Sequence, residues 1–343
     1  MALSRYAMEV RINGVTYVSI EEMEGQVACD VVSFLREWYN DSNYVQGHTS
    51  GSTGVPKAIA LLKQDMRASA RLTNTFLGID SSATLLLCLS PAYIAGKMMI
   101  VRALEAHAEL VVVEPSSMPL QDVKQPITLA AMVPMQVATT LQSDNGEEQL
   151  AWVKQLLVGG APISTTLEQR LMQLATHTYV TYGMTETVSH IALRAVGARQ
   201  YVALGDVSFA VDNRSCLVID APQLSRRHFV TNDVVSLIDS RHFEWLGRYD
   251  NIINSGGLKF CAEDLERKIS AILPHRYYIT SCADELLGQR IVLVIESQAY
   301  SDAEMSRLKD QLSGCLSRYE MPREIRFVER FEETYSGKIK RIL

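Results

Sequence analysis

Residues 49–57 read TSGSTGVPK, a stretch of glycines and small hydroxyl residues that ends in Pro56 and Lys57. Because such residues leave backbone N–H groups uncovered, the chain can wrap around an anion here. Lys57 adds a point charge suited to phosphate oxygens. The stretch is not a Walker A loop, since that motif needs Gly-Lys followed by Ser or Thr. Taken alone, it predicts either a phosphate-binding loop or a flexible surface linker.

Short apolar runs alternate with helical patterns on the C-terminal side of this stretch. Strands are predicted at Leu85–Leu89, Leu110–Val113, Thr128–Met132, Gln155–Val158 and Thr178–Tyr182, and helices at Gln64–Leu77, Pro134–Leu141 and Thr165–Thr176. This alternation predicts an α/β fold with a parallel-rich sheet covered by helices on both faces. On the N-terminal side, Asn13-Gly14 predicts a hairpin turn. Ser19-Ile-Glu-Glu22 has the form of a capping box at the start of a helix that runs to Trp38.

The pattern of the sequence changes twice further along the chain. After about residue 189 it is rich in strand patterns without long helices, and after Gly247-Arg248-Tyr249-Asp250 it restarts as strand, helix (Ala262–Leu273), strands and helix (Asp302–Leu316). We predict a large domain over residues 1–248 and a small, mobile α+β domain over residues 249–343.

Composition limits the class of protein. Hydrophobic residues make up 47% and charged residues 21%, which is typical of a soluble globular enzyme. The net charge of −6 and the lack of any basic block argue against a nucleic-acid partner. Six singly spaced cysteines favour reduced thiols in the cytoplasm, and no stretch has the length and apolarity of a signal peptide or membrane span. The sequence leaves a homo-oligomer open.

Four motifs occur in a fixed order along the chain. They are TSGSTGVPK at 49–57, YGMTET at 182–187, GRYDNIINSGG at 247–257 and SGKIKR at 336–341. Together they resemble the adenylate-forming superfamily of acyl-CoA synthetases, nonribosomal adenylation domains and luciferases. The resemblance implies an enzyme that joins a carboxylic acid to ATP, forming an acyl-adenylate, and then passes the acyl group to coenzyme A. It also implies Mg²⁺, and catalysis mainly by placement and counter-charge.

The resemblance assigns nucleotide contacts in the first part of the chain. The β- and γ-phosphates would be held by Thr49, Ser50, Gly51, Ser52, Thr53, Gly54 and Lys57. Thr185 would bind the α-phosphate, and Glu186 would hold Mg²⁺, for which a carboxylate is a suitable ligand. Tyr182 would pack on the adenine beside the backbone of Gly160 and Ala161. Without its motif, Glu186 would be read as a solvated acid.

Further roles follow from the later motifs. Asp233 would grip the ribose hydroxyls, Arg248 would add a ribose or phosphate contact, and Asp250 would be the hinge of a domain swing between the two half-reactions. Lys338 would be the catalytic lysine of adenylate formation. The thiol channel would be lined by Ser255, Gly256 and Gly257. Lys340 and Arg341 are expected to be solvated charges.

Three departures from the superfamily pattern stand out. Asn232 stands where glycine is usual, and asparagine tolerates a positive φ better than most residues. Phe260-Cys261-Ala262-Glu263 lacks the usual proline before the glutamate. Only 48 residues precede the glycine-rich stretch. We therefore expect part of the usual large domain to be missing or minimal, which leaves the acyl pocket more open or completed by a partner chain.

The substrate side is predicted from SPAYIAGK at 90–97 and from the residues after YGMTET. The first stretch has no aspartate for an amino-acid ammonium group, whereas Lys97 supplies a cation and Tyr93 and His190 are nearby candidates. A cation in an apolar pocket indicates a second substrate carboxylate. These stretches look most like the short bacterial o-succinylbenzoate–CoA ligases of menaquinone biosynthesis. Lys97 could equally extend to water, and a histidine such as His190 is more often a satisfied core or wall residue.

Two other functions stay open on the sequence alone. One is a CoA ligase for another aryl or acyl acid. The other is a non-catalytic adenylate-binding protein, although such a protein has no need for the hinge and the catalytic lysine.

Overall fold

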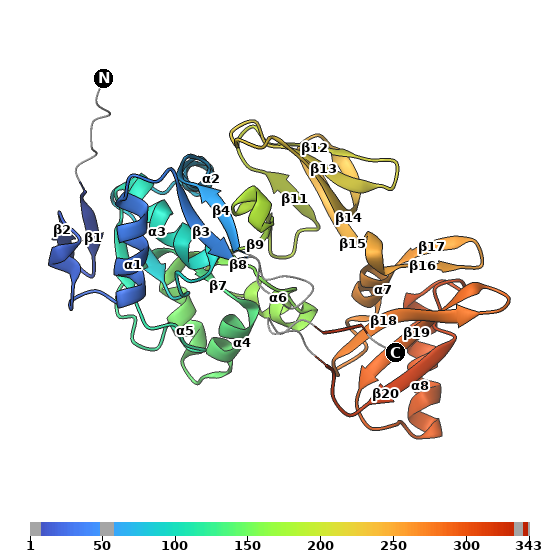
Figure 1. The fold of residues 1–343 in the computed structure, drawn as a ribbon. Coiled ribbons are helices and arrows are strands. Elements are labelled where there is room, and N and C mark those ends of the chain that lie inside the picture. The colour runs from blue at the N-terminus through green and yellow to red at the C-terminus, as the bar shows by residue number, and fades with distance from the viewer. Residues whose placement is uncertain (1–7, 49–57, 333–338, 342–343) are drawn as a thin grey trace. The chain divides into compact units, whose positions relative to one another are not determined.

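The computed structural model describes residues 8–48, 58–332 and 339–341 (Figure 1). The chain divides into two compact units. Unit 1 comprises Met1–Ile163, Leu167–Val207 and Ala221–Arg227, and unit 2 comprises Ser164–Thr166, Ser208–Asp220 and His228–Leu343. These units are defined by contacts within the structure. The domain boundary predicted near residue 249 separates two parts that would move relative to each other, and it stays a prediction.

Unit 1 is built on a parallel sheet with antiparallel additions at its edges. Its strands follow the order β11-β10-β9-β8-β7-β5-β6-β1-β2, and neighbours from β9 to β1 are parallel. Their bounds are β1 (Val10–Ile12), β2 (Val15–Tyr17), β5 (Thr84–Leu87), β6 (Glu109–Val112), β7 (Ile127–Met132), β8 (Val153–Val158), β9 (His177–Gly183), β10 (His190–Ala195) and β11 (Gln200–Ala203). β3 (Tyr44–His48) and β4 (Ala58–Leu62) form a separate antiparallel pair.

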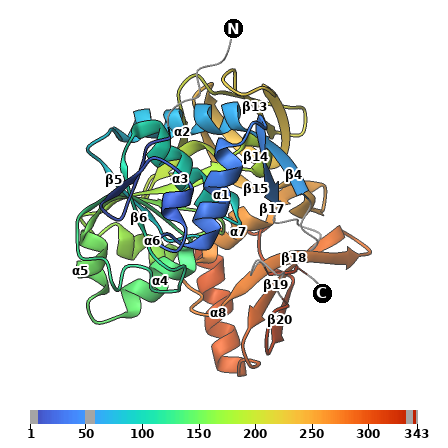
Figure 2. The same ribbon diagram turned by 60° about the vertical axis from the view of Figure 1, so that its left-hand side comes forward.

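Helices cover both faces of this sheet, which confirms the predicted α/β class (Figures 1 and 2). The chain's helices are α1 (Cys29–Tyr39), α2 (Lys63–Leu77), α3 (Ile94–Ala106), α4 (Pro134–Gln142), α5 (Gly146–Ala151), α6 (Thr165–Leu171), α7 (Ala262–Ile269) and α8 (Asp302–Cys315). On one face, Leu86 and Leu156 pack with Val137 and Leu141 of α4 in a fully buried cluster. Each such side chain contributes about 1.5–3 kcal/mol of burial free energy.

The N-terminal predictions were half right. Asn13 and Gly14 have φ of 50° and 79° and turn β1 into β2, as a two-residue hairpin requires. The helix predicted from Ser19 is wrong in its start. Ser19 accepts a hydrogen bond from the Glu22 backbone, but only the short 3-10 turn η1 (Glu21–Met23) follows. Gly25 has a positive φ of 76°, which breaks a helix, and α1 begins at Cys29.

Unit 2 contains two sheets. The first is antiparallel, with β12 (Ser208–Val211), β13 (Cys216–Asp220), β14 (His228–Asp239) and β15 (His242–Arg248) in that order. The second has the order β17-β16-β19-β18, with β20 parallel to β19. Its strands are β16 (Ile252–Ser255), β17 (Leu258–Cys261), β18 (Tyr277–Asp284), β19 (Gly288–Glu296) and β20 (Glu324–Val328). Leu265 of α7 and Leu308 of α8 pack on its inner face.

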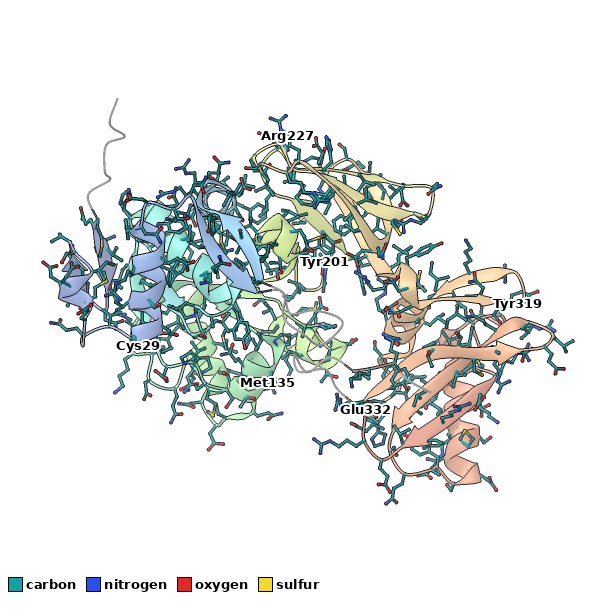
Figure 3. All side chains as sticks on the ribbon, in the orientation of Figure 1. Cys29, Met135, Tyr201, Arg227, Tyr319 and Glu332 are labelled. Carbon is teal, nitrogen blue, oxygen red and sulfur yellow. The ribbon has the colours of Figure 1, made fainter. Side chains whose placement is uncertain are left out.

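All six cysteines are free thiols. Cys88 is buried in unit 1, and burial raises the pKa of its thiol to about 12. Cys29 on α1 and Cys315 at the end of α8 are exposed; Cys29 is labelled in Figure 3. Within the described ranges, no helix has both the length and the apolar character needed to cross a membrane.

Candidate active site

The carboxyl ends of β8 and β9 bring two of the predicted motifs to one edge of the unit 1 sheet. The two strands are parallel neighbours in which Val158 pairs with Val180. Gly160 and Ala161 therefore follow β8 at the same edge where Tyr182 and Gly183 end β9. Gly160 has φ of 82°, a conformation that side-chain-bearing residues rarely adopt. Ligands of parallel α/β sheets bind at this edge, so the placement suits a nucleotide.

The turn after β9 is tightly constrained. Thr185–Thr187 form the 3-10 turn η2. The buried Thr187 hydroxyl accepts from the Met184 N–H at 3.0 Å and lies 2.8 Å from the Ser189 carbonyl oxygen. Val188 then adopts φ 66° and ψ −49°, and the Ser189 N–H donates to the Thr187 carbonyl at 2.7 Å. This is a γ-turn centred on a β-branched residue, a strained conformation of the kind found at ligand sites.

The predicted magnesium and adenine residues lie on or beside this turn. Glu186 is exposed and Thr185 is half-buried. The described residues contain no group of three or more His, Cys, Asp and Glu side chains that could hold a metal. The predicted role of Glu186 is as one ligand of a Mg²⁺ ion that phosphate oxygens also bind, an arrangement that Mg²⁺ commonly has. Tyr182 packs against Tyr201, labelled in Figure 3, with 5.6 Å between ring centroids.

A buried cation that the sequence interpretation missed lies behind this turn. Arg102 of α3 is only 2% exposed, and its guanidinium donates to the Ser189 hydroxyl at 3.0 Å. Its Nε has no hydrogen-bond partner among the described residues. Burial lowers the pKa of Arg102 to about 10, and no carboxylate in the described part of the chain opposes that shift. Glu105, one helical turn later, is already paired with Arg67 and Arg71 of α2.

The sequence did hold a signal for Arg102. It interrupts the apolar run MMIVRAL, and its spacing of three and four residues from Met99 and Met98 places it on their helix face. Both methionines are fully buried. A charged residue on such a face is a candidate for function, because an unpaired buried charge is costly.

The structure does bring His190 to this group. Its ring is buried, with Nε2 2.9 Å from the Thr73 hydroxyl of α2 and Nδ1 3.4 Å from the Ser189 hydroxyl. Burial, and then the charge of Arg102, hold the pKa of His190 well below its usual range. The imidazole is therefore neutral at physiological pH. Its predicted role as a substrate contact stays a prediction.

Lys97 has different partners. Its ammonium lies 3.8 Å from the Glu37 carboxylate and 4.7 Å from the centre of the Phe34 ring, both on α1. Burial lowers the pKa of Lys97, and Glu37 partly opposes that shift. Lys97 is thus a paired cation whose side chain is only 9% exposed. Tyr93 precedes α3 and is 58% exposed. The substrate roles of both residues stay predictions.

Unit 2 holds the predicted ribose and hinge residues. Asp233 of β14 pairs in register with Arg248 of β15. The Arg248 guanidinium bridges two carboxylates, at 3.4 Å from Asp233 and 3.0 Å from Asp250. Trp245 donates its indole N–H to Asp233 at 3.3 Å. The structure therefore joins the ribose-binding candidate to the hinge candidate through one arginine.

The unusual Asn232 has a side-chain role in this unit. It does not adopt the positive φ that its replacement of glycine had indicated. Instead, its amide oxygen accepts from Arg214 at 3.0 Å, and its amide nitrogen lies 3.5 Å from Asp250. Ser255 ends β16, and Gly256 and Gly257, with φ of 59° and 80°, form the turn into β17. The thiol-channel role of these three residues stays a prediction.

Two sets of predicted residues lie outside the described ranges. They are the phosphate loop at residues 49–57 and the lysine at position 338. The expectation for Arg341 was wrong. Its guanidinium is held by the Glu266 carboxylate, with Nη2 2.9 Å from Oε2, and it donates to the Ile279 carbonyl at 2.7 Å. Its side chain is 23% exposed, so Arg341 anchors the chain's end to α7 and β18.

The parallel sheet, the motif residues at the carboxyl ends of its strands and the order of the motifs are typical of a nucleotide-binding α/β protein. The chain belongs to the AMP-binding enzyme family. The profile of that family matches residues 29–228.

Particular relatives narrow the comparison. The 2-succinylbenzoate–CoA ligase of Escherichia coli is 26% identical over 85% of this chain. A solved acyl-CoA synthetase (AMP-forming)/AMP-acid ligase II-like protein from Dyadobacter fermentans is 35% identical, has a TM-score of 0.64 and covers 93% of each chain. The o-succinylbenzoate coenzyme A synthetase of Bacillus subtilis, solved with ATP and magnesium, shares the fold at a TM-score of 0.71 and 18% identity over 86% of this chain and 68% of its own. This chain spans 66% of the length of the E. coli relative.

Proposed function

We propose that this protein is an AMP-forming acid–CoA ligase whose substrate is o-succinylbenzoate, an aromatic keto-dicarboxylate of menaquinone biosynthesis. The observation that carries the proposal is Arg102, a buried guanidinium behind the YGMTET turn that has no carboxylate partner within residues 8–48, 58–332 and 339–341. A buried cation of this kind needs an anion, and a dicarboxylic acid brings one in addition to the group that reacts. The names of several relatives support the same substrate.

The reaction would proceed in two steps. In the first, a substrate carboxylate oxygen attacks the α-phosphorus of ATP and pyrophosphate leaves. In the second, the thiol of coenzyme A attacks the acyl carbon, a thioester bond forms, and AMP leaves with the electrons of the broken acyl–oxygen bond. Both steps bring anions together, so the chain's contribution is to orient groups and to supply positive charge.

Each site residue then has a defined task. Thr185 would donate to the α-phosphate, and Glu186 would bind Mg²⁺, which neutralises charge on the phosphates. Asp233 would accept from the ribose hydroxyls while Trp245 and Arg248 hold its carboxylate in place. Lys338 would serve adenylate formation and withdraw for thioester formation. Asp250 would be the hinge between the two arrangements.

One incubation tests the proposal. The purified protein is mixed with ATP, Mg²⁺, coenzyme A and a panel of acids that includes o-succinylbenzoate and benzoylpropionate, which lacks the ring carboxylate. Pyrophosphate release and the mass of each acyl-CoA are measured. We expect a thioester from o-succinylbenzoate far above all others. A thioester from another acid would keep the chemistry and reject the substrate, whereas no pyrophosphate from any acid would favour a non-catalytic adenylate-binding protein.

A further inference from the structure

A continuous series of hydrogen bonds links Arg102 to the body of helix α2. Arg102 lies 3.0 Å from the Ser189 hydroxyl, which lies 3.4 Å from His190 Nδ1. His190 Nε2 lies 2.9 Å from the Thr73 hydroxyl, and that hydroxyl lies 3.2 Å from the backbone carbonyl of Ser69. The series joins three elements of unit 1: α3, the segment that begins β10, and α2.

One assignment of hydrogens satisfies every bond in this series. A carbonyl only accepts, so when the Thr73 hydroxyl donates its hydrogen to Ser69, it accepts from His190 Nε2–H. A neutral imidazole with a hydrogen on Nε2 has a lone pair on Nδ1, which accepts from the Ser189 hydroxyl. The Ser189 oxygen is then left to accept from Arg102, which can only donate. All four bonds run in one direction without a conflict.

The surroundings keep this arrangement in place. Thr73 is fully buried, and His190 is 8% exposed. An imidazolium would place a hydrogen on Nδ1, facing the Ser189 hydroxyl, and a second positive charge near Arg102. The Arg102 backbone carbonyl also accepts from the Asn74 amide at 3.0 Å, so α2 contacts the backbone of the arginine directly. The guanidinium donates through Nη2 to the Ser189 hydroxyl and through Nη1 to the Met99 sulfur at 3.5 Å, and its Nε has no partner among the described residues.

We propose that Thr73 and His190 are positioning residues for substrate selection, which orient Arg102 through the Ser189 hydroxyl toward the second carboxylate of the substrate. The inference rests on the proposed function and goes one step further. In this inference, Thr73 and His190 determine how well the enzyme discriminates between a dicarboxylate and a monocarboxylate. They do so without needing to touch the substrate. A purely structural series would stabilise the fold and affect both kinds of acid equally.

Kinetics separate these two roles. In Thr73→Val the hydroxyl is lost at nearly constant volume, and in Thr73→Ser it is kept. We expect Thr73→Val to raise the KM for o-succinylbenzoate about five- to tenfold, the effect of one hydrogen bond, with kcat and the KM for ATP unchanged. The ratio of kcat/KM for o-succinylbenzoate to that for benzoylpropionate should fall by the same factor, and Thr73→Ser should restore it.

The chain offers a matched control in Thr140 of α4. Thr140 is also fully buried and also donates to the carbonyl four residues earlier, at 2.8 Å. It lies on α4, whose Val137 and Leu141 belong to the cluster described above, and Arg102 is not a member of that cluster. Thr140→Val should therefore change stability without changing the ratio for the two acids. An unchanged ratio in Thr73→Val, or an equal fall for both acids, would overturn the inference.

A spectroscopic measurement makes the inference independent of turnover. In the ¹⁵N-histidine-labelled full chain, the His190 resonances, assigned by their loss in His190→Gln, should show hydrogen on Nε2 and none on Nδ1 from pH 5.5 to 8. A hydrogen on Nδ1, or an imidazolium in that range, would overturn the inference even if the ligase is active. If the wild-type protein forms no thioester from o-succinylbenzoate while this tautomer is present, the proposed function fails and the assigned selection role falls with it.

Discussion

Replacing Arg102 by methionine should raise the free energy of unfolding of the protein and weaken its binding of o-succinylbenzoate. Burial lowers the pKa of Arg102 from 12.5 to about 10. At roughly 1.4 kcal/mol per pKa unit, the charged form costs the folded state about 3 kcal/mol. Because the folded-state pKa is the lower one, this cost is fully present at pH 7 and shrinks only as the pH rises above about 10. Methionine fills a similar volume without a charge.

The net change in the free energy of unfolding is the cost of burying the charge minus the contribution of the hydrogen bond that methionine cannot make. Loss of the hydrogen bond to Ser189 costs about 1 kcal/mol. We therefore expect Arg102→Met to raise the free energy of unfolding by about 2 kcal/mol and Tm by about 4 °C. Urea unfolding and calorimetry at pH 7.5 measure both. Arg194 is the control, because it is paired with Glu168 at 3.2 Å, and Arg194→Met should destabilise the protein.

The same substitution should weaken the proposed substrate contact. A charge-assisted hydrogen bond to a carboxylate is worth about 1.5–3 kcal/mol, so the KM for o-succinylbenzoate should rise roughly 10- to 150-fold. Turnover of benzoylpropionate should change little. A less stable Arg102→Met protein would refute the idea of an uncompensated buried charge. A stable variant with an unchanged KM would refute the substrate role of Arg102.

Four further substitutions test other parts of the protein. Lys338→Ala should abolish ATP–pyrophosphate exchange yet still convert supplied acyl-adenylate and coenzyme A to thioester; equal loss of both half-reactions would contradict its role. Asp233→Asn should raise the KM for ATP about 10- to 100-fold, because charge-assisted bonds to ribose are lost; an unchanged KM would argue against ribose binding. Gly160→Ala should lower the free energy of unfolding by about 1–2 kcal/mol, because alanine is strained at a φ of 82°. Steric clash adds nothing, since the nearest atom to the new Cβ is 3.5 Å away; urea titration measures the change. Arg341→Ala should destabilise unit 2 by about 3 kcal/mol, because Glu266 would keep a buried charge without its partner; a solvated Arg341 would give no change in the same titration.

The sequence was sufficient for the parts of the fold that depend on local periodicity. Each predicted strand from Leu85 to Tyr182 coincides with an observed strand to within a few residues, because a buried parallel strand is a continuous apolar run. The helix predicted from Ser19 failed because a capping box cannot propagate a helix through a glycine with positive φ.

Tertiary contacts explain what the sequence could not give at the candidate site. Lys97 and Arg102 lie on one helix five residues apart, and only the packing of α1 and α2 decides which cation is neutralised. Lys97 faces Glu37 of α1, whereas Arg102 faces a hydroxyl and a neutral imidazole. Motif resemblance marked Asn232 as a backbone substitution, but its amide instead bridges Arg214 and Asp250. Charge partners across elements leave no periodic trace in a sequence.

The distribution of thiols provides a way to observe the proposed domain swing without redesigning the protein. Cys29 and Cys315 are exposed, and one lies in each compact unit, whereas Cys88 and Cys216 are buried. Burial also raises the pKa of Cys88, which keeps it in the unreactive thiol form. Brief treatment with maleimide dyes at neutral pH should therefore label Cys29 and Cys315 first. Energy transfer between the two dyes would then report the separation of the units as ATP, acid and coenzyme A are added in turn.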